Sequence, residues 1–328
     1  MRKFINSPES AVSEALEGLA FAAGDILHAD GSLVISNALE SAQRVTVAAM
    51  GAAGSEPWGA GFTGFGMADV FASGGIFAPP GPAAVFKALK LADRGRGVLL
   101  VVPNQTGSTL SASIAVKLAA ESGIEVKTVL VCDDCAEAAR SEKAQRRGLL
   151  GVMPVLKAAG AAANSGMDLG AVCAAAGKMA GRLSSFSVLL ASGTHLVTGE
   201  ALAGVTMGSM RLGTGLEGEG GAERPYEGAE QAALCAYEAI AADLALQRGD
   251  KVLLLLSGSG AMSPLELWII ARSLKGILGK EGITAAAIAA GEYLTLADTD
   301  GFTLTLAKMD DELLPLWQAP CRTPCFRR

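Results

Sequence analysis

The chain has 328 residues, half of them apolar and 18% charged, with a net charge of −6. This length suffices for two domains of ordinary size, and the apolar content predicts a large buried interior. A disordered chain would be poor in apolar residues and rich in charge, so the composition excludes disorder. Apart from Arg146-Arg147 and Arg327-Arg328 there is no basic block, so no nucleic-acid partner is expected.

Cysteine usage and hydropathy indicate where the protein works. Six cysteines in a chain that opens without an apolar leader favour a reducing compartment, so we expect a cytoplasmic protein. The most apolar windows, such as residues 97–102 and 252–256, are too short to span a bilayer. No membrane partner is expected.

Short β-rich runs alternate with longer alanine-rich stretches, a pattern typical of layered α/β proteins. Several runs are almost uninterrupted aliphatic sequence, as expected for strands that are covered on both faces. Strands are predicted over residues 45–50, 98–102, 126–131, 187–191, 251–256, 286–290 and 302–307.

Helices are predicted over residues 108–122, 168–183 and 228–246, and in a segment that begins at Ser263. This last segment carries a capping box, with Ser263 as N-cap, Pro264 at the first helical position and Glu266 three residues after the cap. The helix 168–183 marks the expected domain boundary and gives domains 1–183 and 184–328. Residues 208–227 are glycine-rich and aperiodic, which predicts a long functional loop.

Two short loops follow predicted strands and open toward possible ligands. Residues 51–57 (GAAGSEP) follow the first strand, and their backbone N–H groups suit either a ligand or a plain tight turn. The segment lacks the lysine of a P-loop. Residues 104–108 (NQTGS) open a helix, where Ser108 is interpreted first as a helix cap and second as a ligand contact.

The remaining candidates are a glycine-rich stretch, a cysteine pair and a histidine. In residues 212–221 glycine permits close backbone approach to a ligand, and Glu217 and Glu219 are either acid–base groups or solvated carboxylates. Cys132 and Cys135 have C-x-x-C spacing, but a zinc site needs a second pair, and no metal site is predicted. His195 is interpreted as a structural histidine of a polar loop.

These loops, taken with motifs along nearly the whole chain, resemble the DhaK family, the dihydroxyacetone-binding part of dihydroxyacetone kinases. The motifs that carry the resemblance are residues 3–6 (KFIN), 64–67 (GFGM), 75–80 (GIFAPP), 104–107 (NQTG), 146–148 (RRG), 301–311 (GFTLTLAKMDD) and 316–320 (LWQAP).

The resemblance implies two layered α/β domains with mixed sheets flanked by helices, and a homodimer. In that family one histidine forms a hemiaminal with the ketone, while a second histidine and an aspartate handle the hydroxyl proton. ATP or ADP and magnesium are brought by a separate DhaL-like subunit. The resemblance therefore implies no directly bound cofactor, a small carbonyl or polyol ligand, and a DhaL-like partner.

The sequence departs from this pattern at the reacting groups. Glu217 stands where the covalent histidine is expected, Ser55 where the proton-handling histidine is expected, and Ser108 where the aspartate is expected. Pro103 takes the place of a substrate-contacting lysine. We therefore expect no catalytic residues of the family type, and a ligand site formed by Gly54, Ser55, Pro103, Asn104, Ser108 and Glu217.

This pattern predicts a pseudoenzyme, a DhaK-like subunit with a binding or regulatory role. The alternative is an active kinase subunit on a different carbonyl or polyol, with Glu217 or Glu219 as the base and a DhaL-like subunit supplying ATP or ADP. A third reading, a stand-alone metabolite sensor, would require ligand binding without any partner.

Overall fold

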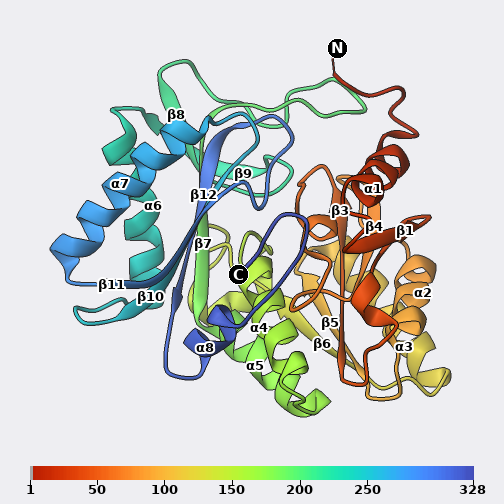
Figure 1. Ribbon diagram of the computed structural model, residues 1–328. Helices are drawn as coiled ribbons and strands as arrows, with labels where there is room; N and C mark the ends of the chain where they lie inside the picture. The colour runs from red at the N-terminus through yellow and green to blue at the C-terminus, as the bar shows by residue number, and fades with distance from the viewer. Residues whose placement is uncertain (1–2) are drawn as a thin grey trace. The chain divides into compact units, whose positions relative to one another are not determined.

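Two separate six-stranded sheets, each mixed and flanked by helices, organise the chain in the computed structural model, which describes residues 3–328 (Figure 1). This confirms the expected fold class. The first sheet has the order β1-β2-β4-β3-β5-β6 and the second β11-β10-β12-β7-β8-β9. Within residues 3–328, no helix is long and apolar enough to cross a membrane.

The first unit contains the described residues up to Val131 together with Val152–Ala180 and Pro315–Arg328. Its strands are β1 (Leu27–Asp30), β2 (Leu33–Ser36), β3 (Thr46–Ala53), β4 (Val70–Ile76), β5 (Val98–Pro103) and β6 (Val126–Val131). Its helices are α1 (Ala11–Ala22), α2 (Pro82–Ala92), α3 (Thr106–Glu121), α4 (Val152–Asn164) and α5 (Leu169–Gly181), with short 3-10 turns at Asn37–Leu39 and Ala60–Phe62.

Strands β3 and β5 lie at the centre of the first sheet and are covered on both faces. Every residue of β5 is buried, which explains its uninterrupted aliphatic sequence. Helices α2 and α3 pack on one face, where they share a core with alternate residues of β3, β4 and β5. Helix α4 contacts β3 and β5 as well, and Figure 1 shows it on the side away from α2 and α3.

The second unit contains Cys132–Gly151 and Gly181–Leu314. Its strands are β7 (Leu183–Ala191), β8 (Ser209–Thr214), β9 (Gly220–Pro225), β10 (Lys251–Gly258), β11 (Thr284–Gly291) and β12 (Asp300–Lys308). Its helices are α6 (Ala229–Leu244) and α7 (Pro264–Glu281), with a 3-10 segment at Arg140–Gln145, and α8 (Leu313–Gln318) begins at its end.

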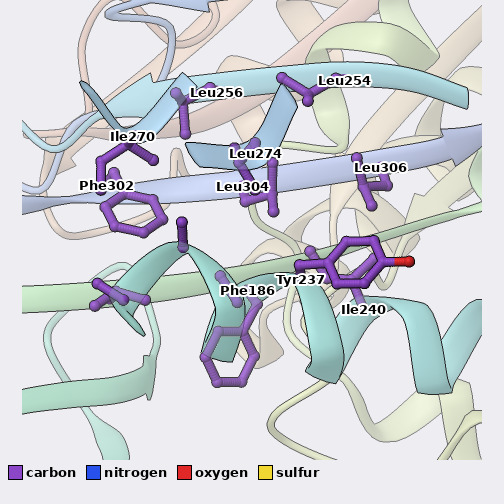
Figure 2. Packing of buried hydrophobic residues seen from close by; sticks show 14 of the residues in the cluster. Phe186, Tyr237, Ile240, Leu254, Leu256, Ile270, Leu274, Phe302, Leu304 and Leu306 are labelled. Atoms are coloured by element: carbon purple, nitrogen blue, oxygen red, sulfur yellow. The ribbon is translucent and has the colours of Figure 1, made fainter. Parts of the chain in front are cut away.

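The two faces of the second sheet differ in chemistry. Helices α6 and α7 cover one face, where Phe186, Leu254, Phe302 and Leu304 belong to one hydrophobic cluster with Ile240 and Ile270 (Figure 2). The alternate residues of β7 and β12 on the other face carry hydroxyls, and Ser185 and Thr305 share a hydrogen bond of 2.6 Å. Side chains of successive residues point to opposite faces, so one strand pair contributes both to an apolar core and to a buried polar face.

Each unit combines segments that are far apart in the sequence, so a single boundary after residue 183 does not divide the chain as the structure does. Residues 132–151 belong to the second unit because Asp134 pairs with Ser185 of β7. Residues 315–328 return to the first unit, where Cys325 N donates to Gly61 O and Arg322 N donates to Phe65 O. The placement of both segments depends on backbone contacts between residues that are more than 40 positions apart in the sequence.

The prediction of a long loop over residues 208–227 is wrong. Strands β8 and β9 form an antiparallel hairpin there, with Leu212 opposite Ala222 and Thr214 opposite Gly220. All six residues of β9 are exposed, so the strand lacks the apolar alternation by which a half-buried strand is recognised. The capping box of α7 is confirmed, since Ser263 Oγ accepts from Glu266 N and the Glu266 carboxylate accepts from Ser263 N.

A fully buried lysine joins the C-terminal segment to α4. Lys157 Nζ donates to Leu316 O at 2.8 Å, next to the buried Trp317, whose ring packs against Phe326. Burial lowers the pKa of Lys157 to about 8, although the nearby Cys321 acts in the opposite direction. The first unit therefore holds a charged group at neutral pH at a cost in desolvation.

We expect this lysine to give the free energy of unfolding a pH dependence. Between pH 8 and about 10.4, the ordinary lysine pKa, the unfolded chain binds a proton that the folded chain has lost, so stability rises with pH. The gain is about 3 kcal/mol at most. Urea unfolding of Lys157→Met should lack this rise, while Lys117→Gln, at an exposed site, should follow the native protein. Parallel curves for the native protein and Lys157→Met would refute the assignment.

Candidate functional site

The order of the parallel strands locates a candidate site in the first unit. β3 pairs in parallel with both β4 and β5, so the chain leaves β3 toward one side of the sheet and continues from β5 toward the other. Ligands of open α/β sheets bind at such a switch point, beside the carboxyl ends of the strands. The segments that follow β3 and β5 contain Gly54, Ser55, Asn104 and Ser108. Four of the six expected ligand residues thus share one sheet edge.

The loop after β3 is held by its own backbone. Gly54 has φ +103°, and a Cβ there would lie 2.8 Å from the ring of Phe77, so glycine is required. Its N–H donates to the Glu56 carboxylate at 2.9 Å. Loss of surrounding water raises the pKa of Glu56, and these backbone hydrogen bonds oppose the rise. Ser55 lies in the middle of the loop and is only 4% exposed.

The loop after β5 enters α3 without a side-chain cap. Pro103, the last residue of β5, accepts a hydrogen bond from Gln105 N through its carbonyl, and Asn104 N donates to Val131 O. Gln105 is the N-cap and its side chain caps nothing. A Cβ on Gly107 would lie 2.6 Å from Pro79, which brings the segment after β4 to the same edge.

The interpretation of Ser108 as a helix cap is wrong. The helix begins two residues earlier, at Thr106, so Ser108 lies inside its first turn. Its side chain is fully buried, and within residues 3–328 its Oγ has no hydrogen-bond partner. A buried hydroxyl without a partner costs about 1–3 kcal/mol, so an unpaired group at this edge is unusual.

In the second unit, Glu217 lies at the tip of the β8–β9 hairpin. The turn closes through Gly215 N to Glu219 O at 2.9 Å, and Glu217 N donates to the Glu219 carboxylate at 2.8 Å. The Glu217 side chain is exposed at this turn. Partial burial raises the pKa of Glu217, and the neighbouring Glu219 raises it further, while His195 acts in the opposite direction.

Arg147 fixes this turn. Its Nη1 lies 3.1 Å from both the Oε1 and the backbone oxygen of Glu219, while its Nε donates to Asp134 at 3.0 Å. The Asp134 side chain is fully buried and that of Arg147 is 13% exposed, so the pair is largely removed from water. The hairpin tip is thereby joined to residues 132–151 by a chain of charge-assisted hydrogen bonds.

The same segment is anchored by two further buried charges. Asp133 accepts the N–H groups of Leu149 at 2.6 Å and Gly151 at 2.7 Å, and Ser185 donates to it from β7. Arg146 pairs with Asp243 of α6 at 2.5 Å. The motif at residues 146–148 therefore has a structural role. Sequence reasoning missed Asp133, Asp134 and Arg147 as supporting residues. The signal that could have found them is the occurrence of two neighbouring aspartates and two neighbouring arginines in so apolar a chain.

A small cavity of about 10 Å³ adjoins the Glu217 turn. Its lining includes the hydroxyl-bearing residues Ser187, Thr214, Ser259 and Thr303, together with Gly215 and Leu216 of the turn. This volume holds about one water-sized group. The polar face of the second sheet thus provides hydrogen-bonding groups beside the turn that carries Glu217.

The remaining sequence candidates have local roles. Burial raises the pKa of both Cys132 and Cys135, and all six cysteines are free thiols. Among the described residues, no group of three or more His, Cys, Asp or Glu side chains is placed to hold a metal ion. His195 Nδ1 lies 3.2 Å from the N–H groups of Val197 and Thr198, in agreement with a structural loop histidine.

We expect Arg147→Met to loosen the hairpin tip. Loss of the guanidinium leaves Asp134 buried without its partner and releases Glu219, whose oxygens hold the N–H groups of Gly215 and Glu217. Hydrogen exchange at these two amides should accelerate by about 10- to 100-fold, as expected for loss of a charge-assisted hydrogen bond. Arg224→Met removes an exposed charge from the same hairpin and should leave their exchange unchanged. Equal exchange in Arg147→Met and the native protein would contradict the clamp.

Comparison with known proteins agrees with this architecture. The chain is 34% identical to the PTS-dependent dihydroxyacetone kinase 2, dihydroxyacetone-binding subunit DhaK, of Listeria innocua, over 100% of this chain and 99% of that one. It is 31% identical to the DhaK subunit of the PEP-dependent dihydroxyacetone kinase of Escherichia coli, over 99% of each. It is also 32% identical to the L-erythrulose 1-kinase of Mycolicibacterium smegmatis, spanning 58% of that protein.

Solved structures show the same fold. The dihydroxyacetone kinase of C. freundii superposes with a TM-score of 0.88 at 27% identity, covering 98% of this chain and 60% of that chain. The dihydroxyacetone kinase operon co-activator DhaQ superposes with a TM-score of 0.89 at 23% identity, covering 95% and 97%. The model of the Dak1 domain matches residues 17–325. The chain therefore belongs to the Dak1 family, the family of the dihydroxyacetone-binding subunit DhaK.

Proposed function

We propose that this chain is a DhaK-type subunit that binds a small carbonyl or polyol compound reversibly and does not support ordinary dihydroxyacetone phosphorylation. The observation that carries the proposal is the identity of two residues. Ser55 and Glu217 occupy the loops where family resemblance places the two reacting histidines. The fold around them is kept, so the difference concerns chemistry and leaves the support for a binding pocket intact.

The missing imidazoles decide what the site can do. A hemiaminal requires a nitrogen nucleophile, which neither a carboxylate nor a hydroxyl supplies. A serine hydroxyl has no pKa near neutrality and cannot act alone as a general base. The chain contains two histidines, and both have local partners: His28 Nδ1 lies 2.9 Å from Asn37 Oδ1, and His195 Nδ1 lies against the N–H groups of its own loop.

The polar groups at the carboxyl ends of β3 and β5 are suited to an uncharged ligand that has hydroxyl or carbonyl oxygens. Ser55 and Ser108 contribute hydroxyls, and Asn104 contributes an amide, where the family pattern has a histidine, an aspartate and their neighbours. The Ser108 Oγ has no partner within residues 3–328, and a hydroxyl or carbonyl of a ligand would satisfy it. Relatives named for dihydroxyacetone and L-erythrulose point to small ketoses as the ligand class.

The proposed partners rest on the same similarity to DhaK subunits. Relatives are named as dihydroxyacetone-binding subunits of kinases, so other subunits of those kinases take part in the reaction. We propose a homodimer that docks with a DhaL-like subunit, and we assign ATP or ADP and magnesium to that subunit. In this arrangement the present chain acts as a binding, regulatory or scaffold partner.

A second candidate function is phosphorylation of a different carbonyl or polyol, with Glu217 as the base. It is favoured by one observation: partial burial and the neighbouring Glu219 raise the pKa of Glu217, the direction that makes a carboxylate a better base. Glu219 is a poorer candidate because its carboxylate is paired with Arg147 at 3.1 Å.

The proposal predicts that the native chain, mixed with a DhaL-type subunit, ATP, magnesium and dihydroxyacetone, releases ADP only at the rate measured without this chain. The variant Ser55→His, Ser108→Asp, Glu217→His restores the family's reacting groups and should release ADP above that background. A pull-down with the DhaL-type subunit serves as the control that both forms dock.

Substrate-dependent ADP release by the native chain with dihydroxyacetone would contradict the proposal. Release with another polyol that falls by about 10²- to 10⁴-fold in Glu217→Gln would establish the second candidate instead.

A further inference from the structure

A second, larger cavity of the second unit lies away from the hydroxyl-lined one. Its volume is about 140 Å³, and it is lined from β7, β12, α6 and α7. Its lining residues Val188 and Phe302 belong to the core shared with α6 and α7, whereas Ser187 and Thr303 line the small cavity beside Glu217. The two cavities therefore open on opposite faces of the same sheet, because neighbouring residues of a strand point to opposite faces.

The walls of this cavity are mainly apolar. Val188, Ala232, Ile270 and Phe302 line it and are each at most 3% exposed. Figure 2 shows Ile270 of α7 and Phe302 of β12 next to each other. A dry apolar cavity of roughly this size, about 150 Å³, is known to accept a benzene ring. The space therefore suits a compact apolar group of about that size.

The cavity is accessible from solvent. Tyr226 and Ile269 contribute to its lining and are 39% and 42% exposed. Ile269 continues into an exposed apolar surface on the first turns of α7, where Leu265 and Trp268 lie. A ligand can enter without unfolding of the core.

Two carboxylates give the cavity its charge. Asp300, at the start of β12, is partly buried and, within residues 3–328, its side chain has no hydrogen bond or ion pair. Glu266 is bound to Ser263 through the capping box of α7. The nearby Arg272 pairs with Glu230 and does not line the cavity. No cation among the cavity-lining residues balances these two acids.

The partly buried Asp300 carboxylate faces a second acid, the exposed Glu266, and no cation in the cavity lining. A carboxylate removed from water is normally paired, and a second acid nearby increases the cost of its charge. Burial raises the pKa of Asp300 and Glu266 raises it further, in agreement with that cost. An ammonium group would relieve both effects, whereas a carboxylate or phosphate would be repelled. A metal ion is a poor fit because apolar side chains make up most of the wall and only two carboxylates are available.

We propose that this cavity binds a small primary amine, with its apolar body against Val188, Ala232 and Phe302 and its ammonium group on Asp300. The assignment is independent of the function proposed for the Glu217 side of the sheet. It describes a second ligand site on the opposite face of the same unit.

Benzylamine is a suitable probe, and benzyl alcohol and benzoate are its matched neutral and anionic counterparts. Titrations of the full chain at pH 7, followed by amide chemical shifts, should show saturable benzylamine binding with shifts at Val188, Ala232 and Phe302. Benzylamine should bind at least about tenfold more tightly than benzyl alcohol, as expected for one charge-assisted contact, and benzoate should not bind.

Three variants test the residues. Asp300→Asn is nearly isosteric and should remove the preference for benzylamine over benzyl alcohol. Glu238→Gln makes the same charge change at an exposed site of α6 outside the cavity and should leave the preference intact. Ala232→Leu fills the space and should abolish binding of both compounds.

The proposal is overturned if benzylamine and benzyl alcohol bind equally, if neither binds saturably, or if the shifts cluster elsewhere on the protein. It is also overturned if Asp300→Asn retains the tenfold preference. Because Asp300→Asn and Glu238→Gln both preserve side-chain shape, the test does not depend on whether Ala232→Leu folds.

Discussion

The chain of contacts from Asp134 through Arg147 to Glu219 is the interaction on which the second unit's candidate site depends. Residues 132–151 carry little regular structure, and buried charges hold them in place: Asp133 takes two backbone N–H groups, and Arg146 pairs with Asp243. From this anchored segment Arg147 reaches the hairpin tip and fixes the backbone that presents Glu217. Removal of one partner from such a buried pair typically costs about 3–5 kcal/mol, so the clamp is a strong constraint.

In the first unit, the candidate residues are positioned by strand ends and close backbone packing. Parallel strands β3 and β5 end at one edge, and close backbone packing at Gly54 and Gly107 shapes the segments that follow them. Ser55 and Ser108 are buried there. Neither the Arg147 contacts nor the backbone packing at Gly54 and Gly107 involves the side chains of Glu217, Ser55 or Ser108. The fold can therefore be retained while the side chains at these positions differ, which changes the chemistry open to the site without removing the means to bind a ligand.

Much of this arrangement was predictable from sequence, for reasons that particular elements make clear. The buried strand β5, the β-branched strand β6 and the capped helix α7 carry local signals, so their positions were predicted closely. The hairpin β1–β2 also carries one, the two-residue loop Gly31-Ser32 with Gly31 at positive φ, which was overlooked. Strand β9 carries none, because all its side chains face solvent.

The candidate site was less predictable than the fold. The two loops of the first unit could be found because each follows a predicted strand, but the first residue of α3 was misjudged, and with it the role of Ser108. The clamp on Glu217 joins residues 13 and 72 positions apart, and no local pattern reveals such pairs. The cavity near Asp300 arises from four elements brought together only by folding.

We propose that the chain, with Ser55 and Ser108 in one unit and Glu217 in the other, binds a ketone without a covalent bond, and carbon NMR tests this most directly. Dihydroxyacetone labelled with ¹³C at the carbonyl would be added to the protein and its bound resonance recorded. We predict that the bound carbon keeps the chemical shift of the free trigonal carbonyl. A resonance in the range of a tetrahedral carbon bonded to nitrogen, retained in Glu217→Gln, would contradict it and show that another residue of the chain supplies the nucleophile.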